Sequence, residues 1–465
     1  MLKPFVVNEL EKIVGPANFF TTPTALITYS HDATQQESLP WAVVQPTTTR
    51  EVSEILALAN RERIPVVPRG AGTGMSGGSV PVCGGIVLSC ERMNRIIEID
   101  EDNLVAVVEP GVITGNLQIE VESRGLFYPP DPASHDTSTI GGNVAECAGG
   151  LRAVKYGVTK DYVLALEVVL PAGEIINTGA RTMKSVAGYD LTKLFVGSEG
   201  TLGVATRITL KLLPLPETVR TISAFFTDIR GAVRAVSEIM KSRIIPRSLE
   251  FVDKAALNAV ETYLSEDLSG GAAAMLIIEV DGPSETTERE AKQIVEILTK
   301  LDALRVNRAE SDQEREHLWK ARRALSPALE TLNLKKVNED IVVPRSRIPD
   351  ILREIGNVAQ RYGFLIVNFG HAGDGNIHTN IMVNEVDLPK AQEAAREIFA
   401  ATLRLGGSIT GEHGVGISKA TYLPMELGPE TISAMKRIKH ALDPNNIMNP
   451  GKIFLSSDVE LRSAG

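Results

Sequence analysis

The chain has 465 residues, 43% of them hydrophobic, and a mean hydropathy of +0.02. A chain of this length is too long for one hydrophobic core, so we expect two to four domains. The net charge of −10 and the pI of about 5.4 argue against a nucleic-acid partner, because phosphate backbones bind concentrated basic surfaces.

Targeting and redox features are sparse. No apolar run approaches the roughly 20 residues that span a bilayer, and acidic residues stand where a signal peptide has its apolar core. Cys83, Cys90 and Cys147 have no CxxC spacing, so we expect reduced thiols and neither disulfides nor an iron–sulfur site. These features predict a cytoplasmic protein, with any membrane contact made through a partner.

The first part of the chain predicts a mixed helix and strand domain after a helical lead-in at residues 1–36. Short apolar runs bounded by turn residues predict strands, and apolar residues at helical spacing predict helices. The expected elements are a strand at 41–46, a helix at 49–63, a strand at 64–67, three strands within 86–112, a helix at 114–123 and a hairpin at 165–177.

A glycine-rich loop follows the second strand, at Pro68–Gly78. Such a density of glycine lets the backbone turn sharply, and its N–H groups can hold a phosphate. The loop contains Gly72-x-Gly74-x-x-Gly77, but a Rossmann loop opens a helix and a strand follows here, which excludes that fold. Small-residue loops at 128–157 and 197–204 have the same character, so one long ligand is expected across this domain.

Pro214 and Pro216 predict a domain boundary, because closely spaced prolines end a strand and stiffen a connection. Beyond them strands and helices alternate, which predicts an antiparallel or mixed sheet with helices on one face. Ser311-Asp-Gln-Glu314 is a capping-box pattern that opens a helix. The expected later elements are helices at 229–242, 286–303, 311–329, 348–361 and 429–443, a helix that begins near 387, and strands at 221–226, 248–252, 272–281, 304–309, 341–343, 364–367 and 377–383.

Two histidine motifs lie in this second half. His371 and His378 flank a tight Gly373-Asp-Gly375 turn between two predicted strands, and Glu412 and His413 form a second polar cluster between glycines. Two imidazoles and a carboxylate suit Zn²⁺, Mn²⁺ or Fe²⁺. A hydrogen-bonded histidine pair in a turn is the alternative interpretation, and an Asp between glycines, Asp374, is a turn-former and no ligand.

Six ordered motifs together resemble the FAD-linked dehydrogenases of the vanillyl-alcohol-oxidase (PCMH) type. The closest branch contains D-lactate dehydrogenases, D-2-hydroxyglutarate dehydrogenases and the D subunit of glycolate oxidase. The resemblance runs from about Trp41 to Phe454, and its motifs are residues 68–78, 139–145, 197–204, 371–378, 411–416 and 449–452.

The resemblance implies an α+β fold with a two-subdomain PCMH-type FAD-binding domain. A substrate cap domain with a mixed or antiparallel sheet covered by helices follows, and the C-terminal segment returns to the FAD domain. The implied boundaries are 1–36 for the helical lead-in, 37–216 for the FAD domain, 217–420 for the cap with the metal site and 421–465 for the C-terminal segment.

The resemblance also implies site residues. It implies a metal held by His371, His378 and Glu412, with zinc first and manganese or iron as alternatives. His413 is implied as the catalytic base, Arg322 as a catalytic residue that binds the substrate carboxylate, and Ser326, Lys336 and Asn376 as substrate contacts, although Lys335 fits the lysine motif as well. The implied FAD contacts are Pro68, Arg69, Gly70, Ala71, Gly72, Thr73, Gly74, Ser76, Gly77, Pro130, Asp131, Ser134, Thr139, Gly142, Asn143, Ala145, Gly149, Gly150, Tyr156, Gly157, Glu199, Gly200, Val204 and Asn449.

The implied activity is oxidation of a D-2-hydroxy acid to the 2-oxo acid by FAD. A divalent ion would acidify the substrate hydroxyl, the imidazole of His413 would take its proton, and Arg322 would orient the carboxylate. D-lactate or glycolate is the expected substrate, with D-2-hydroxyglutarate as the alternative. The FAD is expected to be non-covalent, because the glycine loop offers no histidine for attachment.

Electrons must then leave the flavin. The implied acceptor is an electron-transferring flavoprotein, an iron–sulfur subunit, a cytochrome or a quinone-linked complex, and the chain is expected as a homodimer or as a subunit of a larger complex. Three other classes stay open: a flavin-free metal-dependent hydrolase or metal-binding protein, an ether-lipid synthase relative, and a non-catalytic glycolate oxidase subunit. Glu412 beside His413 argues against the second, and the histidine motifs argue against the third.

Overall fold

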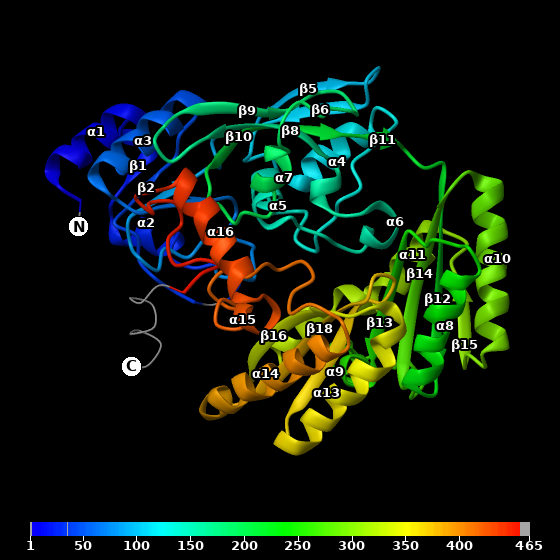
Figure 1. The fold of residues 1–465 in the computed structure, drawn as a ribbon. Helices are drawn as coiled ribbons and strands as arrows, with labels where there is room; N and C mark the ends of the chain where they lie inside the picture. Colours follow the sequence, from blue (N-terminus) through cyan, green and yellow to red (C-terminus); the bar gives the residue numbers. More distant parts are fainter. Residues whose placement is uncertain (1, 35, 456–465) are drawn as a thin grey trace. The chain divides into compact units, whose positions relative to one another are not determined.

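The computed structural model describes residues 2–34 and 36–455, and they divide into two compact units. Unit 1 contains the described residues of 1–149, 158–215 and the segment from 412 onward, and unit 2 contains residues 150–157 and 216–411. Both units combine helices with sheets (Figure 1), so the expected α+β class is confirmed. Within the described residues, no helix has the length and apolar character needed to span a membrane.

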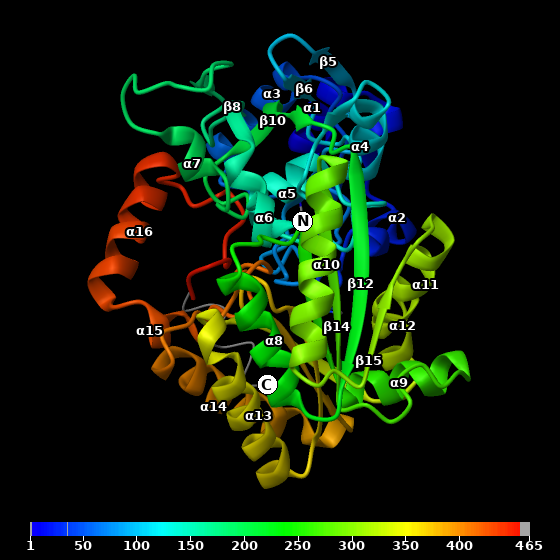
Figure 2. The same ribbon diagram turned by 90° about the vertical axis from the view of Figure 1, so that its right-hand side faces the viewer.

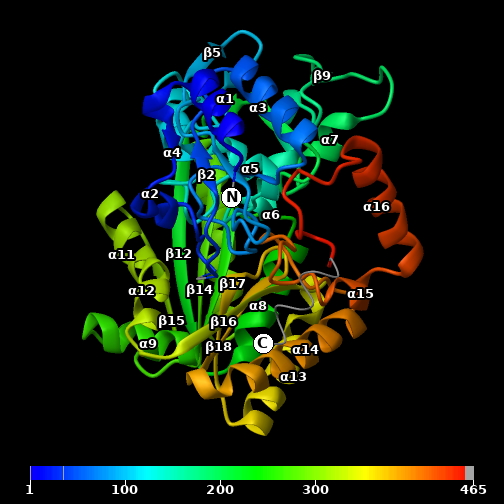
Figure 3. The same cartoon turned by 90° about the vertical axis from the view of Figure 1, so that its left-hand side faces the viewer.

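The first sheet of unit 1 has four strands in the order β1-β2-β4-β3, and β4 pairs in parallel with both β2 and β3. Thr48 caps the adjacent α3 by accepting a hydrogen bond from the Glu51 N–H. Figure 3 shows α1 beside α3, and Val6, Leu10, Ile55 and Leu56 from these helices share one core cluster. The elements are α1 (Pro4–Val14), β1 (Phe19–Phe20), α2 (Pro23–Thr28), β2 (Ala42–Val44), α3 (Thr49–Glu62), β3 (Val66–Arg69) and β4 (Ile86–Ser89).

The second sheet of unit 1 has five antiparallel strands in the order β5-β6-β10-β8-β9. The predicted hairpin at 165–177 is the β8–β9 pair. Short helices flank the sheet, and a two-stranded ribbon joins β7 to β11. The elements are β5 (Ile96–Asp100), β6 (Val105–Val108), α4 (Thr114–Glu122), β7 (Leu126–Phe127), α5 (Ile140–Glu146), β8 (Val163–Val169), β9 (Ile175–Gly179), α7 (Leu191–Phe195), β10 (Val204–Lys211) and β11 (Leu213–Pro214).

The C-terminal segment belongs to unit 1. It contains α15 (Leu423–Glu426) and α16 (Pro429–Leu442), and the chain after α16 runs beside β3. The Val66 N–H donates to the Ile447 carbonyl at 2.8 Å, and the Asn449 N–H donates to the Val66 carbonyl at 2.8 Å. Ile447 and Met448 enter the core cluster of the first sheet, so this segment completes the unit's core.

Unit 2 is built on a seven-stranded sheet in the order β15-β12-β14-β13-β17-β18-β16, with every neighbouring pair antiparallel. Figure 2 shows α10 running along β12, and Figure 3 shows α13 beside α14. The strands are β12 (Thr218–Phe226), β13 (Ser248–Asp253), β14 (Ala274–Gly282), β15 (Arg305–Arg308), β16 (Lys335–Val342), β17 (Leu365–His371) and β18 (Asn376–Val383). The helices are α6 (Ala153–Tyr156), α8 (Ile229–Lys241), α9 (Lys254–Leu264), α10 (Ser284–Lys300), α11 (Asp312–Arg323), α12 (Leu325–Glu330), α13 (Ile348–Tyr362) and α14 (Leu388–Arg404).

Helices cover both faces of this sheet, so the expectation of helices on one face was wrong. In β14, Met275 and Ile277 pack in a cluster with residues of α9, α11 and α12. Leu276 and Ile278 are fully buried and point the other way, because successive strand residues face opposite sides. Helices α8 and α10 contact β14 as well. The run of buried residues along β14 is typical of a strand covered on both faces.

The chain leaves unit 2 earlier than the expected residue 420. The Gly411 N–H donates to the Asp340 carbonyl at 2.8 Å, so this residue is fixed in unit 2. The Gly416 N–H donates to Glu199 of unit 1 at 2.7 Å. The boundary between Gly411 and Glu412 therefore lies where the hydrogen-bond partners change from unit 2 to unit 1. No local sequence pattern indicates this change.

Residues 150–157 also depart from the expected boundaries, because they form part of unit 2 although their neighbours on both sides belong to unit 1. The buried carboxylate of Asp281 binds this segment: Lys155 Nζ lies 2.5 Å from Oδ1, and the Tyr156 hydroxyl donates to Oδ2 at 2.8 Å. Leu151 packs against the α9, α11 and α12 cluster.

Candidate active site

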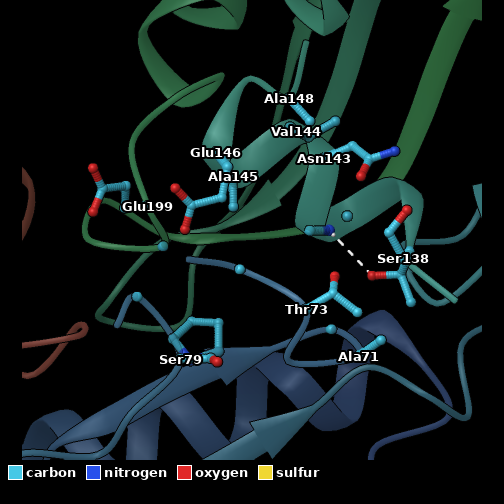
Figure 4. Close-up of a pocket in the computed structure, with 18 of the residues that line it drawn as sticks. Ala71, Thr73, Ser79, Ser138, Asn143, Val144, Ala145, Glu146, Ala148 and Glu199 are labelled. Carbon is cyan, nitrogen blue, oxygen red and sulfur yellow. Dashed lines mark hydrogen bonds between the residues drawn. The ribbon is translucent and has the colours of Figure 1, made fainter. Parts of the chain in front are cut away.

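A pocket in unit 1 is lined by the three predicted small-residue loops (Figure 4). The figure places Ala71, Thr73 and Ser79 on one side and Val144, Ala145 and Ala148 across from them. The predicted FAD contacts that line it are Pro68, Arg69, Gly70, Ala71, Gly72, Thr73, Gly74, Ser134, Thr139, Gly142, Asn143, Ala145, Gly149, Glu199, Gly200 and Val204.

The glycine loop lies too close to its neighbours for larger side chains. A Cβ atom on Gly70 would overlap the Thr139 hydroxyl, which caps α5 by accepting from the Gly142 N–H at 3.2 Å. Gly77 has φ +78°, and a Cβ atom there would overlap the Ile417 side chain. The loop backbone is therefore left bare beside the pocket, as contact with a phosphate-containing ligand requires.

Arg69 organises this loop from within. Its Nη1 donates to the His31 carbonyl at 2.7 Å and to the Ser79 hydroxyl at 3.2 Å, and its guanidinium lies 5.6 Å from the Tyr29 ring centroid. The N-terminal segment therefore supports the pocket, a role that sequence reasoning missed because no motif in residues 1–36 indicates it.

The other predicted FAD contacts do not line this pocket: Ser76, Gly77, Pro130, Asp131, Gly150, Tyr156, Gly157 and Asn449. Gly150, Tyr156 and Gly157 belong to unit 2. Asn449 supports the pocket from behind, since its Nδ2 donates to the Gly78 and Glu199 carbonyls at 2.8 and 2.7 Å. Lining residues that were not predicted mostly adjoin the motifs and include Met75, Gly78, Ser79, Pro110, Pro132, Ala133, Ser138, Gly141, Val144, Glu146, Ala148, Phe195, Ser198, Gly203 and Ala205.

The predicted pair of histidines is present in unit 2. Residues His371, at the end of β17, and His378, in β18, are 5% and 7% exposed. Their Nε2 atoms lie 3.4 Å apart, and the ring planes are nearly perpendicular at 87°. The turn between them is closed by Gly375, whose N–H donates to the His371 carbonyl at 3.0 Å. Asp374 accepts from the Asn376 N–H at 3.2 Å, as a turn-former does.

Glu250 is the functional candidate that sequence reasoning missed. It lies in β13, opposite His371 in the sheet register, and its side chain is fully buried. His371 Nδ1 lies 2.6 Å from Oε1, and Arg322 Nε donates to Oε2 at 2.8 Å. Burial by itself would raise the pKa of Glu250, but the charges of His371 and Arg322 lower it to about 2.

The hydrogen bond from His371 Nδ1 to Glu250 selects the tautomer of the imidazole. In the neutral form of the ring, with Nδ1 donating, Nε2 carries the lone pair and lies on the side of His378 Nε2. Two nitrogen ligands at about 2.0–2.1 Å from a tetrahedral Zn²⁺ would be about 3.4 Å apart. The observed Nε2 separation of 3.4 Å thus fits a shared divalent cation.

The predicted substrate residues occupy different environments in unit 2. Arg322 in α11 also lies over the Phe369 ring at 4.9 Å. Asn376 is buried, and its Nδ2 donates to the Asp340 and Ile341 carbonyls, which braces β18 against β16. Ser326 and Lys336 are exposed.

The strand register separates Lys336 from the histidines. His378 pairs with Asp340 in β16, whereas Lys336 pairs with Met382. Four residues along a strand span about 13 Å. The strand pairing therefore does not bring Lys336 beside His378. A contact between Lys336 and the substrate is implied only by the family resemblance.

Glu412 and His413 line the unit 1 pocket together with the glycine loop. A Cβ atom on Gly149 would lie 2.7 Å from Glu412 Oε2, which places this carboxylate beside a predicted FAD contact. The structure thus brings the second histidine motif to the pocket, and Glu412 directly follows Gly411, which unit 2 fixes.

Comparisons with known proteins identify the family of the chain. Residues 215–453 match the family model of the C-terminal domain of FAD linked oxidases, and residues 40–179 match an FAD binding domain. The chain belongs to the FAD-linked oxidases, and it is an oxidoreductase. It is 49% identical to the glycolate oxidase subunit GlcD of Bacillus subtilis (strain 168), over 98% of this chain and 97% of the relative.

Other relatives carry related names. The chain is 37% identical to a D-lactate dehydrogenase of Anaerostipes hadrus, over 91% of this chain and 92% of the relative. It is 34% identical to a D-2-hydroxyglutarate dehydrogenase of Stutzerimonas stutzeri (strain A1501), over 98% of this chain and 100% of the relative. The match to an FAD binding domain argues against the alternative of a flavin-free hydrolase.

The fold itself resembles that of a solved p-cresol methylhydroxylase with substrate bound, with a TM-score of 0.80 and 19% identity over 98% of this chain and 97% of that chain. A solved alkyldihydroxyacetonephosphate synthase has a TM-score of 0.76 and 21% identity, over 97% of this chain and 86% of that chain. The predicted PCMH-type fold is confirmed.

Proposed function

We propose that this protein oxidises a D-2-hydroxy acid, D-lactate or glycolate, to the 2-oxo acid with the aid of a divalent cation. The observation that carries the proposal is the group formed by the half-buried Arg322 and the buried Glu250, His371 and His378, in a chain of the FAD-linked oxidase family. The relatives named for glycolate, D-lactate and D-2-hydroxyglutarate support a small hydroxy acid as the substrate.

The cation would be held by His371, His378 and Glu412. The two imidazoles have the separation that a tetrahedral ion needs, and Glu412 follows Gly411, whose N–H also donates to Asp340 Oδ2 at 2.9 Å. One carboxylate with two imidazoles suits Zn²⁺ first, with Mn²⁺ or Fe²⁺ as alternatives. Such an ion lowers the pKa of a bound hydroxyl group.

Arg322 would bind the substrate carboxylate. Its Nε is engaged by Glu250, and a guanidinium has further N–H donors in a planar fork that matches a carboxylate. Because Glu250 and Phe369 fix the guanidinium, the carboxylate would be oriented with little loss of side-chain freedom. This holds the substrate in one orientation, as stereospecific oxidation requires.

His413 would accept the substrate hydroxyl proton. It lines the same pocket as the glycine loop, and an imidazole exchanges protons readily near neutral pH. Residues 68–79 and 138–149 would hold the FAD without a covalent bond, and FAD when bound takes up the substrate hydride.

An external protein would take the electrons onward. The three cysteines have no iron–sulfur spacing, which supports transfer of the electrons to a redox centre outside this chain. Relatives named as glycolate oxidase subunits support an acceptor within a complex, such as an iron–sulfur subunit, a cytochrome or an electron-transferring flavoprotein.

Anaerobic reduction of the bound flavin tests this proposal. The holoprotein is mixed with D-lactate, L-lactate, glycolate and D-2-hydroxyglutarate, and the loss of flavin absorbance is followed. We expect rapid bleaching with D-lactate or glycolate and little with L-lactate. Equal rates for both lactate enantiomers, or no bleaching by any acid, would contradict the proposal, and preferential bleaching by D-2-hydroxyglutarate would assign that substrate.

The role of His413 is tested by His413→Ala. We expect retained FAD and a rate of flavin reduction about 10²–10⁴-fold lower, the usual contribution of a general base. A variant that is reduced at the parental rate would remove His413 from the mechanism.

A further inference from the structure

Glu199 has an unusual arrangement in unit 1. It lies in the turn before β10 with φ +53°, and it is only 6% exposed. Its two carboxylate oxygens bind successive backbone amides: Oε1 accepts from the Val415 N–H at 2.8 Å and Oε2 from the Gly416 N–H at 2.7 Å. These amides lie two and three residues after His413.

The segment that Glu199 binds has no helix or strand of its own from Glu412 to Gly416. Gly414 and Gly416 have φ +84° and +48°, values that favour glycine and leave the backbone with many alternatives when it is not held. Ser76 fixes the next residues, because its carbonyl accepts from the Ile417 and Ser418 N–H groups at 2.9 and 3.1 Å. Of the contacts made by Glu199 and Ser76, those of the Glu199 carboxylate are therefore the nearer to His413 along the chain.

Glu199 is itself held in place. Asn449 Nδ2 donates to its carbonyl at 2.7 Å, and Asn449 is bound to the glycine loop through Gly78. Figure 4 shows Glu199 next to Glu146 at one side of the pocket. Burial raises the pKa of Glu199, and the two amides counteract this by favouring the charged form. Burying a carboxylate is costly unless it is hydrogen-bonded, so the two amides stabilise Glu199 and are in turn held by strong, charge-assisted hydrogen bonds.

We infer that Glu199 is a positioning residue for His413: it fixes the backbone of residues 412–416, and through it the direction of the imidazole in the pocket. The inference rests on the proposed role of His413 as proton acceptor. It differs from the expectation that Glu199 serves only as a contact along the FAD nucleotide.

The test uses Glu199→Gln in the FAD-loaded holoprotein with D-lactate as the substrate. The glutamine keeps the size of the side chain but turns an NH₂ group toward one backbone N–H. We expect the rate of flavin reduction per bound FAD to fall about 10- to 100-fold, the effect of losing one charge-assisted hydrogen bond. The pH dependence of this rate should shift, whereas the substrate concentration for half-maximal rate should change little.

Glu167→Gln is the matched control. Glu167 lies in β8 of the same unit, its Oε1 accepts from Thr49 and Thr206 hydroxyls at 2.7 and 3.0 Å, and it does not line the pocket. We expect parental rates and a parental pH profile. Loss of FAD from Glu199→Gln with an unchanged rate per remaining flavin would overturn the inference, because Glu199 would then act on the cofactor alone.

A second variant keeps the test valid if Glu199→Gln does not fold. A Cβ atom on Gly414 would overlap Glu146 Oε2 and would lie 3.0 Å from Glu199 Oε1, so Gly414→Ala should displace both carboxylates beside the loop, including the one that holds the Val415 and Gly416 amides. Gly125→Ala is its control, because Gly125 has a similar φ of +71° and open space around its Cβ position. We expect slower flavin reduction and a shifted pH profile for Gly414→Ala only, and equal profiles for both variants would contradict the inference.

Pairing with His413→Ala separates the two proposals. If Glu199 acts through His413, external imidazole should restore the same rate of flavin reduction to His413→Ala with and without Glu199→Gln. If the two residues act independently, the effects of the two substitutions on this rate should multiply. Multiplying effects would overturn the inference. A parental rate in His413→Ala alone would instead overturn the proposed base, and a parental Glu199→Gln beside an impaired His413→Ala would overturn only the inference.

Discussion

His371 Nδ1 and Glu250 Oε1 lie 2.6 Å apart, on neighbouring strands β17 and β13. The other oxygen of Glu250 binds Arg322 at 2.8 Å, so one buried carboxylate joins a proposed metal ligand to the proposed substrate clamp. A metal-binding histidine commonly donates its second ring N–H to a carboxylate, which fixes the ring and strengthens the ligand. Glu250 therefore orients both groups at once.

Glu250→Gln should weaken metal binding by about 10- to 100-fold, because a neutral amide oxygen is a weaker acceptor for the His371 Nδ1–H and strengthens the ligand less than a carboxylate does. Competition with a chromophoric chelator measures the affinity. Glu279→Gln is the control, since Glu279 is a buried carboxylate of the same sheet that accepts from Trp319 and Thr221 instead. Equal affinities for the two variants would contradict this role of Glu250.

Removal of the metal should stop turnover. Dialysis of the holoprotein against a chelator should suppress flavin reduction by D-lactate, and added Zn²⁺, Mn²⁺ or Fe²⁺ should restore it, because the hydroxyl proton is otherwise too weakly acidic. His378→Ala should retain FAD and bind no metal, measured by elemental analysis. Full activity in verified metal-free protein would rule out the ion's role.

Arg322→Lys should raise KM for D-lactate by about 10- to 150-fold, because a lysine cannot form the bidentate pair. Steady-state kinetics with D-lactate measure the effect. Arg323→Lys is the control, since the neighbouring Arg323 is exposed and pairs with Glu316. An Arg322→Lys variant with the parental KM would argue that another group binds the carboxylate.

Gly70→Ala should release FAD, because the new methyl group would overlap the Thr139 hydroxyl and move the loop away from the pocket. The ratio of flavin to protein absorbance in the purified variant measures the loss. Gly356→Ala is the control, since its Cβ position is open and Gly356 lies within helix α13, where alanine is favourable. Full flavin content in Gly70→Ala would show that the loop can adjust.

Asp253 should make the stability of the protein depend on pH. Burial raises its pKa to about 6, against hydrogen bonds from Ala256 and Asn368 that favour the charged form. The pKa of Asp253 in the folded protein exceeds the ordinary value of 3.8. Its contribution to the free energy of unfolding is therefore fully present below about pH 4 and is lost as the pH rises through 6.

Asp253→Asn removes this titration. The excess stability of the parental protein over the variant should therefore shrink by at most about 3 kcal/mol between pH 4 and pH 6.5. Urea unfolding at several pH values measures it. Asp228→Asn, at an exposed helix N-cap, is the control. A difference for Asp253→Asn that grows with pH would contradict the direction of this pKa shift.

Local patterns determined most elements of the chain. The predicted helix at 49–63 is α3 at Thr49–Glu62, and the strands around His371 and His378 are β17 and β18. These elements depend on apolar spacing and turn residues within about a dozen positions, which the sequence displays directly. The ordered motifs identified the FAD-linked family as well, because each motif is a contiguous run.

Only the tertiary structure decided which distant side chains meet. Glu250 is separated from His371 by 121 residues and Glu199 from Val415 by 216, and neither glutamate has a local pattern that indicates its partner. The partners are fixed by strand register and by the return of the C-terminal segment. These are properties of the packed chain, because a hydrogen bond between distant residues depends on every element that folds between them.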